Sequence, residues 1–222
     1  MTHKTNETNK THKTHKTYKS HKTYRTHRTH STHKTYKTYK TYILLLAILF
    51  ATACGDETIS NKFCNLPAQF TFTPVQSISQ LYSSCESMGE WCSITVSKDG
   101  KSYLFTKPDG SQGRANKTAL SSYTNFIMGL SGFIVGLPNI PEVGEMFSVV
   151  TCYDLACRNC YEDFGITRDL QFQGTDGKVS CSRCKRHYDL NNTGQVVQGN
   201  MGQPLYRYRV YYGNSTLSIN NR

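Results

Sequence analysis

Short apolar runs separated by turn sequences predict a β-rich fold for the part of the chain that follows residue 62. Gly-containing turns at Asp99-Gly100, Pro108-Asp109-Gly110 and Gly174–Gly177 stand between these runs, as in successive hairpins. The expected hairpin partners are Trp91–Ser97 with Ser102–Thr106, Leu170–Gln173 with Lys178–Cys181, and Leu205–Tyr212 with Ser215–Ile219. Only Ala119–Met128 suggests a short helix. The pattern therefore predicts a single all-β domain over residues 63–222.

The apolar segment Met128–Pro141 leaves two interpretations open. It could be an exposed surface that binds a partner, or its side chains could be buried. Burial is the expected outcome for Phe133, Ile134, Val135 and Leu137, because large aliphatic and aromatic side chains are usually inside.

The segment before the domain differs completely in pattern. Residues 1–42 repeat a triplet of Thr or Ser, then His, Tyr or Asn, then usually Lys or Arg, and contain no Leu, Ile, Val or Ala. Such a sequence cannot bury a core, so it is expected to be disordered, or to reflect an incorrectly assigned gene start. It holds eleven Lys/Arg and one Glu, a net charge of +10, whereas the remaining fifteen basic and fourteen acidic residues leave only +1. The domain itself therefore offers no charge excess for nucleic acid.

Residues 43–54 have the pattern of a bacterial export signal. The apolar run Ile43–Phe50 follows basic residues, is too short to span a bilayer, and precedes Ala51-Thr52-Ala53-Cys54. The small residues that end on Cys54 resemble the bacterial lipobox, in which this cysteine is lipidated. The resemblance implies a lipoprotein anchored to the outer membrane through Cys54, periplasmic or surface-facing, with residues 55–62 as a linker. Ordinary secretory cleavage is the alternative.

Four of the nine cysteines form two closely spaced pairs. Cys157-Arg-Asn-Cys160 and Cys181-Ser-Arg-Cys184 are twenty residues apart. A C-x-x-C pair can direct both sulfurs at one ion, and two such pairs complete a tetrahedron. The spacing predicts a metal site formed by Cys157, Cys160, Cys181 and Cys184, in a subdomain of about residues 150–190.

The residues around the second pair resemble the Rieske-type domain, over roughly Val149–Ile219. Tyr188-Asp189-Leu190, the turn Asn191–Gly194, Gly199 and Pro204-Leu205 follow in the order found in that family. The resemblance implies a β-sandwich with an inserted subdomain built like a zinc ribbon or rubredoxin. It also implies that Tyr188 hydrogen-bonds a sulfur of the metal centre and that the Pro204 segment covers it.

The ligands depart from the family, which uses two cysteines and two histidines for a 2Fe-2S cluster. Here Asn159 occupies the first histidine position, and Cys184 replaces the second. Two residues separate Cys157 from Cys160, and this spacing favours convergence of both sulfurs on one ion. That ion would be either a structural zinc or a rubredoxin-like iron. A 2Fe-2S cluster held by four thiolates remains the alternative cofactor, and the protein would then transfer electrons to a redox partner.

Export to an oxidising compartment raises a further alternative, a disulfide-stapled binding module. The other four cysteines could form two disulfides in three connectivities, and Cys85 and Cys92 flank a turn at Gly89-Glu90 that would suit cross-strand partners. Bonded C-x-x-C pairs usually lie at a helix start, whereas both pairs here are expected in β-ribbon. These four cysteines are Cys64, Cys85, Cys92 and Cys152.

No motif for substrate chemistry accompanies the cysteines. His187 is the only histidine outside residues 1–42, so a histidine-based catalytic site has one candidate imidazole. The expected roles are therefore structural, with an unidentified envelope protein as partner, or electron transfer. An enzymatic activity is not expected.

Overall fold

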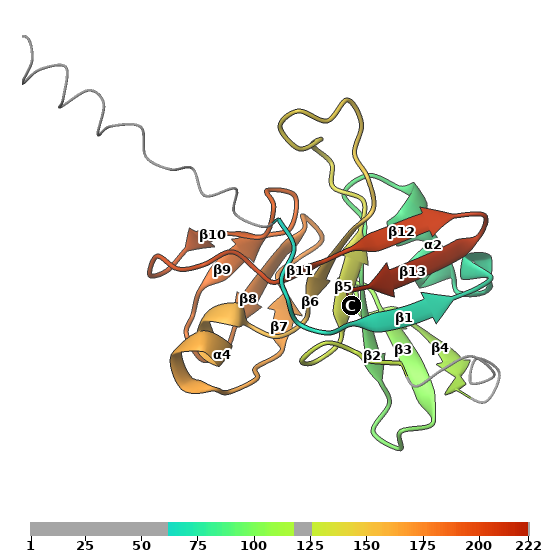
Figure 1. The fold of residues 1–222 in the computed structure, drawn as a ribbon, viewed down its shortest axis with the longest axis horizontal. Helices are drawn as coiled ribbons and strands as arrows, with labels where there is room; N and C mark the ends of the chain where they lie inside the picture. The colour runs from blue at the N-terminus through green and yellow to red at the C-terminus, as the bar shows by residue number, and fades with distance from the viewer. Residues whose placement is uncertain (1–61, 118–125, 222) are drawn as a thin grey trace, which may run out of the picture. The chain divides into compact units, whose positions relative to one another are not determined.

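The computed structural model describes residues 62–117 and 126–221, all within one compact unit, Thr58–Arg222. Its elements are mostly β-strands in three antiparallel sheets, so the all-β prediction is confirmed (Figure 1). The expectations for residues 1–42, the export signal and nearly all of the linker lie outside the described residues. Among the described residues, no helix is long and apolar enough to cross a membrane.

The largest sheet has six strands in the order β11-β6-β5-β2-β3-β4. The predicted hairpin of Trp91–Ser97 with Ser102–Thr106 is present, and Gly100 takes a left-handed backbone (φ 70°) at its turn. Strands β5 and β6 are buried on both faces, which explains the continuous apolar sequence of β5. The six strands are β2 (Trp91–Val96), β3 (Ser102–Thr106), β4 (Gln112–Asn116), β5 (Phe133–Gly136), β6 (Thr151–Asp154) and β11 (Arg207–Tyr208).

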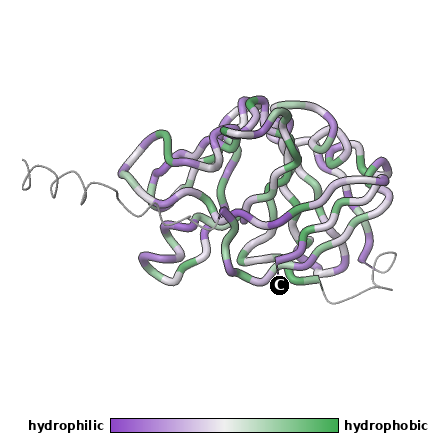
Figure 2. The backbone as a smooth tube through the Cα atoms, turned by 45° about the horizontal axis from the view of Figure 1, so that its top comes forward, coloured by the Kyte–Doolittle hydropathy of each residue, from purple (hydrophilic) through white to green (hydrophobic). Residues whose placement is uncertain are grey.

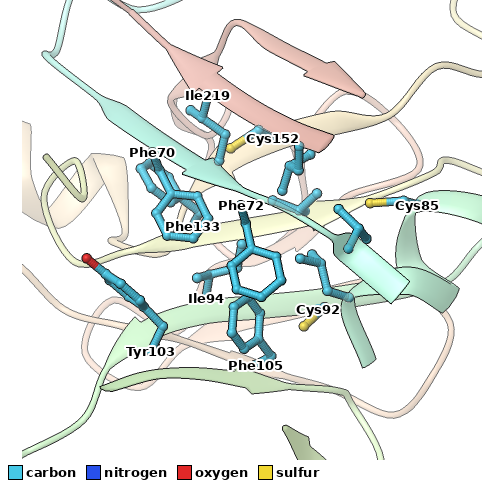
Figure 3. Packing of buried hydrophobic residues seen from close by; sticks show 14 of the residues in the cluster. Phe70, Phe72, Cys85, Cys92, Ile94, Tyr103, Phe105, Phe133, Cys152 and Ile219 are labelled. Atoms are coloured by element: carbon cyan, nitrogen blue, oxygen red, sulfur yellow. The ribbon is translucent and has the colours of Figure 1, made fainter. Parts of the chain in front are cut away.

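A three-stranded sheet covers one face of this sheet and has the order β1-β13-β12. Its strands are β1 (Gln69–Phe72), β12 (Val210–Gly213) and β13 (Thr216–Asn220). The predicted C-terminal hairpin forms only from Val210 onward, because Arg207–Tyr208 pairs with β6 instead. Between the two sheets lies the aromatic core, in which Phe72 and Phe105 have ring centroids 5.0 Å apart (Figure 3). The aromatic core consists mainly of Phe70, Phe72, Ile94, Tyr103, Phe105, Phe133, Val135, Tyr208, Leu217 and Ile219, with Cys85, Cys92 and Cys152.

The third sheet has four strands in the order β10-β9-β8-β7 and carries the second cysteine pair. Its strands are β7 (Leu170–Phe172), β8 (Lys178–Cys181), β9 (His187–Asp189) and β10 (Gln195–Gln198). Because side chains alternate between faces along a strand, Phe133 and Val135 enter the aromatic core, while Ile134 between them faces the opposite way. Ile134 belongs to the cysteine core, which consists of Trp91, Ile134, Tyr153, Leu155, Cys157, Cys160, Leu170, Val179, Cys181, Tyr188, Leu190 and Leu205.

Two short α-helices occur where strands and turns were expected. Helix α2 (Ser79–Glu86) follows the 3-10 turn η1 (Val75–Ser77), and helix α4 (Arg158–Phe164) contains part of the first cysteine pair. Most of the predicted helix Ala119–Met128 lies outside the described residues. Its described end is not helical, because Ile127 forms an antiparallel bridge with Gln69.

The burial predicted for the Met128–Pro141 segment is largely found. Phe133, Ile134 and Val135 are fully buried, while Leu137 is partly exposed. Hydrophobic and hydrophilic residues are interspersed along the backbone, as strands with two different faces require (Figure 2).

Candidate metal centre

The first cysteine pair lies at the start of a helix. Cys157 is the N-cap of α4 and its carbonyl accepts a hydrogen bond from the Tyr161 amide at 3.1 Å, while Cys160 lies in the first turn. The expectation that both pairs lie in β-ribbon is therefore wrong for this pair. The helix ends at Gly165, whose left-handed backbone (φ 65°) provides the C-cap. The helical turn places both sulfurs on the side of α4 that faces β8.

The second pair lies in the tight turn between β8 and β9. The Lys185 amide donates to the Cys181 carbonyl at 3.0 Å, and the Cys181 amide donates to the Arg186 carbonyl at 3.0 Å. Lys185 takes a positive φ of 59°, which closes the turn. The turn therefore places the sulfur of Cys184 near that of Cys181.

The four predicted ligands are brought together. The sulfur atoms of Cys157, Cys160, Cys181 and Cys184 all lie within 4.8 Å of one another. Close contacts link the two pairs, with 3.6 Å between the sulfurs of Cys157 and Cys184 and 3.6 Å between those of Cys160 and Cys181. Cys157, Cys160 and Cys181 are buried, and Cys184 is partly exposed. This group is positioned to hold a metal ion.

Burial determines the direction of the pKa shift at Cys157 and Cys160 but not at Cys184. It raises the pKa of Cys157 to about 11, although hydrogen bonds from the Tyr188 hydroxyl and the Cys160 amide act in the opposite direction. Burial and the contact with Cys181 raise the pKa of Cys160 as well. At Cys184 burial also raises the pKa, but the Arg186 amide, the contact with Cys157 and the Arg186 side chain lower it to about 7 overall. Four thiolates in this volume therefore require a cation to offset their charge.

The Tyr188 side chain lies beside the four-cysteine group. Its hydroxyl oxygen lies 3.1 Å from the Cys157 sulfur and accepts a hydrogen bond from the Asn159 side-chain amide at 2.9 Å. Tyr188 itself is fully buried in β9. Hydrogen bonds to ligand sulfurs orient the ligand and tune the metal.

Asn159 also holds the Gly199–Pro204 segment beside the centre. Its side chain donates to the Gln203 carbonyl at 2.8 Å and accepts from the Gln203 amide at 2.9 Å. Gly202 is required here, because a Cβ at this position would lie 2.4 Å from the Asn159 Oδ1. Pro204 contributes its carbonyl, which lies 3.4 Å from an Arg158 guanidinium nitrogen. The sequence identified Asn159 only as a replaced histidine, and no signal in it indicated this pairing across 44 residues.

Arg186 ties the same segment to the second cysteine pair. Its guanidinium donates to the Asn200 carbonyl at 3.0 Å and to the Met201 carbonyl at 3.2 Å. Arg186 stands two residues after Cys184 in sequence, so its side chain connects the β8–β9 turn to the Gly199–Pro204 segment.

The other four described cysteines are free thiols in this structure. Cys85, Cys92 and Cys152 are buried in the aromatic core and Cys64 packs against it (Figure 3). The interpretation of Cys85 and Cys92 as cross-strand partners is wrong, because Cys85 lies in helix α2 and only Cys92 lies in a strand. Cys54 lies outside the described residues, so its lipidation stays a prediction.

The chain matches no protein-family model and no curated protein. The functional argument therefore rests on the residues of this chain and their geometry.

Proposed function

We propose that the protein is an envelope lipoprotein, tethered through Cys54, whose β domain is stabilised by one zinc or iron ion bound to Cys157, Cys160, Cys181 and Cys184. In this role the ion pins α4 to the β7–β10 sheet, and the surrounding loops bind an envelope partner. The near-neutral charge of residues 43–222 argues against nucleic acid as that partner.

The sulfur geometry carries the proposal. Metal–sulfur bonds of about 2.3 Å in a tetrahedron place neighbouring sulfurs about 3.8 Å apart. Two of the sulfur contacts are 3.6 Å, and no pair of the four exceeds 4.8 Å. In a binuclear cluster, the sulfurs on different irons are separated further by the distance between the irons. The compact arrangement therefore supports a single ion over a 2Fe-2S cluster.

The same contacts count against disulfides within the site. A disulfide has a sulfur–sulfur distance of about 2.05 Å. Here all four cysteines are free, and sulfur contacts of 3.6 Å join residues from different C-x-x-C pairs. This arrangement suits four ligands around a common centre better than two redox-active pairs.

Electron transfer is a second candidate, favoured by the contact of Tyr188 with Cys157. A hydroxyl 3.1 Å from a ligand sulfur would stabilise the reduced state of an iron centre. Cys184 is partly exposed, which gives one ligand a short path to a docked redox partner. The resemblance of Val149–Ile219 to Rieske-type domains is consistent with this function.

Elemental analysis and a visible spectrum distinguish these functions in the full chain, purified without oxygen and without added metal. One zinc per chain and no colour supports the structural role, whereas iron with acid-labile sulfide supports a 2Fe-2S carrier. One iron without sulfide supports a rubredoxin-like centre. Cys157→Ser should abolish the bound metal, and the matched variant Cys85→Ser, in a buried cysteine outside the centre, should retain it. A purified chain without any metal would contradict the proposal.

The anchoring is tested separately by fractionating cells that produce the full chain. The wild-type protein should be found with membranes, and Cys54→Ala should release it. A Cys54→Ala variant that stays with the membranes in equal amount would contradict lipidation at this residue.

A further inference from the structure

The loop between β5 and β6 projects from the sheets (Figure 1). It carries several exposed apolar side chains. Isolated exposed apolar residues are common, but a group on one loop indicates a contact surface. We call residues 137–150 the apolar loop. Its exposed large side chains, with their exposed fractions, are Ile140 (64%), Val143 (106%), Met146 (85%), Phe147 (74%) and Val149 (51%).

The base of the apolar loop is fixed to the domain. The Gly89 amide donates to the Leu137 carbonyl at 2.7 Å, and the Asn139 amide donates to the Asn191 side chain at 3.0 Å. Glu142 forms ion pairs with Arg207 and with Lys62. The apolar tip is therefore presented from a defined base.

The position of Lys62 indicates what covers the loop. Lys62 is the first described residue, and its ammonium lies 2.5 Å from the Glu142 carboxylate. Cys54 is only eight residues earlier in the chain, and eight extended residues span at most about 29 Å. If Cys54 is anchored in a bilayer, the membrane surface lies within this reach of the base of the apolar loop.

The chemistry of the loop suits a lipid surface. Residues 137–150 contain no Lys or Arg and two acids, of which Glu142 is already ion-paired, so insertion would depend on apolar contact rather than on charge. Tyr211, 64% exposed on β12, lines one surface hollow together with Val149. Tyrosine favours the headgroup region of a membrane, where its ring and hydroxyl meet different environments.

We propose that the apolar loop inserts Val143, Met146 and Phe147 into the membrane to which Cys54 tethers the chain, and so orients the domain on the bilayer. The inference rests on the tethering included in the proposed function. It gives the chain a second membrane contact, which would fix the orientation of the domain relative to the bilayer.

Depth-dependent fluorescence quenching tests this contact in the full lipidated chain. The protein is reconstituted into phosphatidylethanolamine–phosphatidylglycerol vesicles with or without brominated acyl chains, as Phe147→Trp and Val143→Trp. The native Trp91 is fully buried and supplies a constant background. The control is Phe164→Trp, at a side chain 59% exposed on α4. Brominated lipid should quench the two loop probes at least about twofold more than the control.

Flotation of the same samples separates the two claims. A chain that floats with the vesicles while its loop probes are quenched no more than the control overturns loop insertion and leaves the anchoring intact. A chain that does not float overturns both. Loop probes with blue-shifted emission before vesicles are added, and no change afterwards, would show that a second copy of the protein covers the loop, and would also overturn insertion.

Discussion

The two cores of the domain are held together by different interactions. The aromatic core closes by packing alone, with rings such as Phe70 and Tyr103 5.2 Å apart and edge-on. The cysteine core includes three of the four clustered thiols as members, and strands β7 and β9 beside it have only three residues each. The cysteine core has fewer buried members than the aromatic core, and its sulfur atoms lie beside short strands, so this half of the domain is expected to depend more on an ion.

The largest effect is expected from breaking the cysteine core at a ligand. Cys181→Ser should lower the free energy of unfolding by more than about 4 kcal/mol, because a closed metal site contributes folding free energy directly. Thermal unfolding with metal analysis measures both losses. The control Cys85→Ala changes a buried cysteine of the aromatic core and should keep its metal. Unchanged melting of Cys181→Ser would count against every metal-centred account.

The aromatic core can be weakened by a substitution that leaves the four cysteines of the metal centre unchanged. Phe105→Ala removes a fully buried ring and should cost about 3–5 kcal/mol, through lost burial and a residual cavity. The folded fraction should still bind one metal ion per chain, because Phe105 lies outside the cysteine core. Urea unfolding with metal analysis of the folded protein provides the test. Loss of metal from folded Phe105→Ala would show that the cores are not separable.

A smaller effect is expected at the hydroxyl beside the centre. Tyr188→Phe removes the contact with Cys157 and one partner of Asn159, which retains its hydrogen bonds to Gln203. The free energy of unfolding should fall by about 1 kcal/mol. With iron bound, the reduction potential should also fall, since a hydrogen bond to a ligand sulfur is lost. Tyr211→Phe, at an exposed tyrosine, is the matched control, and equal effects of the two would contradict a specific role for Tyr188.

The smallest effect concerns Asp154, at the junction of the two cores. Its carboxylate accepts hydrogen bonds from the Leu130 amide at 2.8 Å, the Ala156 amide at 2.7 Å and the Tyr208 hydroxyl. Burial raises the pKa of Asp154 despite these hydrogen bonds. The folded state therefore holds the proton more tightly than the unfolded state, and this residue's contribution to stability declines as pH rises from about 4 through the raised pKa.

Asp154→Asn should remove that decline. Urea unfolding of both proteins across this pH range should show that the free energy of unfolding of Asp154→Asn rises relative to that of the wild-type protein as the pH increases. A difference that is constant with pH would show that Asp154 has the same pKa in both states.

The sequence predicted those features that depend on local signals. Gly100 and Gly110 mark the turns of real hairpins, and the spacing of the cysteine pairs identified four residues that converge in space. Helix α2 was missed because its sequence, SQLYSSCE, buries only Leu81, Ser84 and Cys85 and has a weak apolar pattern. Helix α4 was missed because its seven residues are too few for periodicity to appear.

The features that depend on distant contacts could not be predicted. Asn159 joins Tyr188 and Gln203 only after the chain has folded, since these partners are 29 and 44 residues away. The exposed tip of the apolar loop was also missed, because its residues resemble the preceding buried strand β5 in composition. Whether these apolar side chains are buried depends on whether a neighbouring strand covers them. The residues themselves do not specify this.

X-ray absorption at the edge of the bound metal in the purified full chain tests the central claim most directly. A single ion bound to Cys157, Cys160, Cys181 and Cys184 predicts a shell of four sulfur atoms at about 2.3 Å and no nearby metal scatterer. A second metal atom close to the first would contradict a single-ion centre and indicate a cluster. A shell dominated by oxygen or nitrogen would contradict binding by the four cysteines altogether.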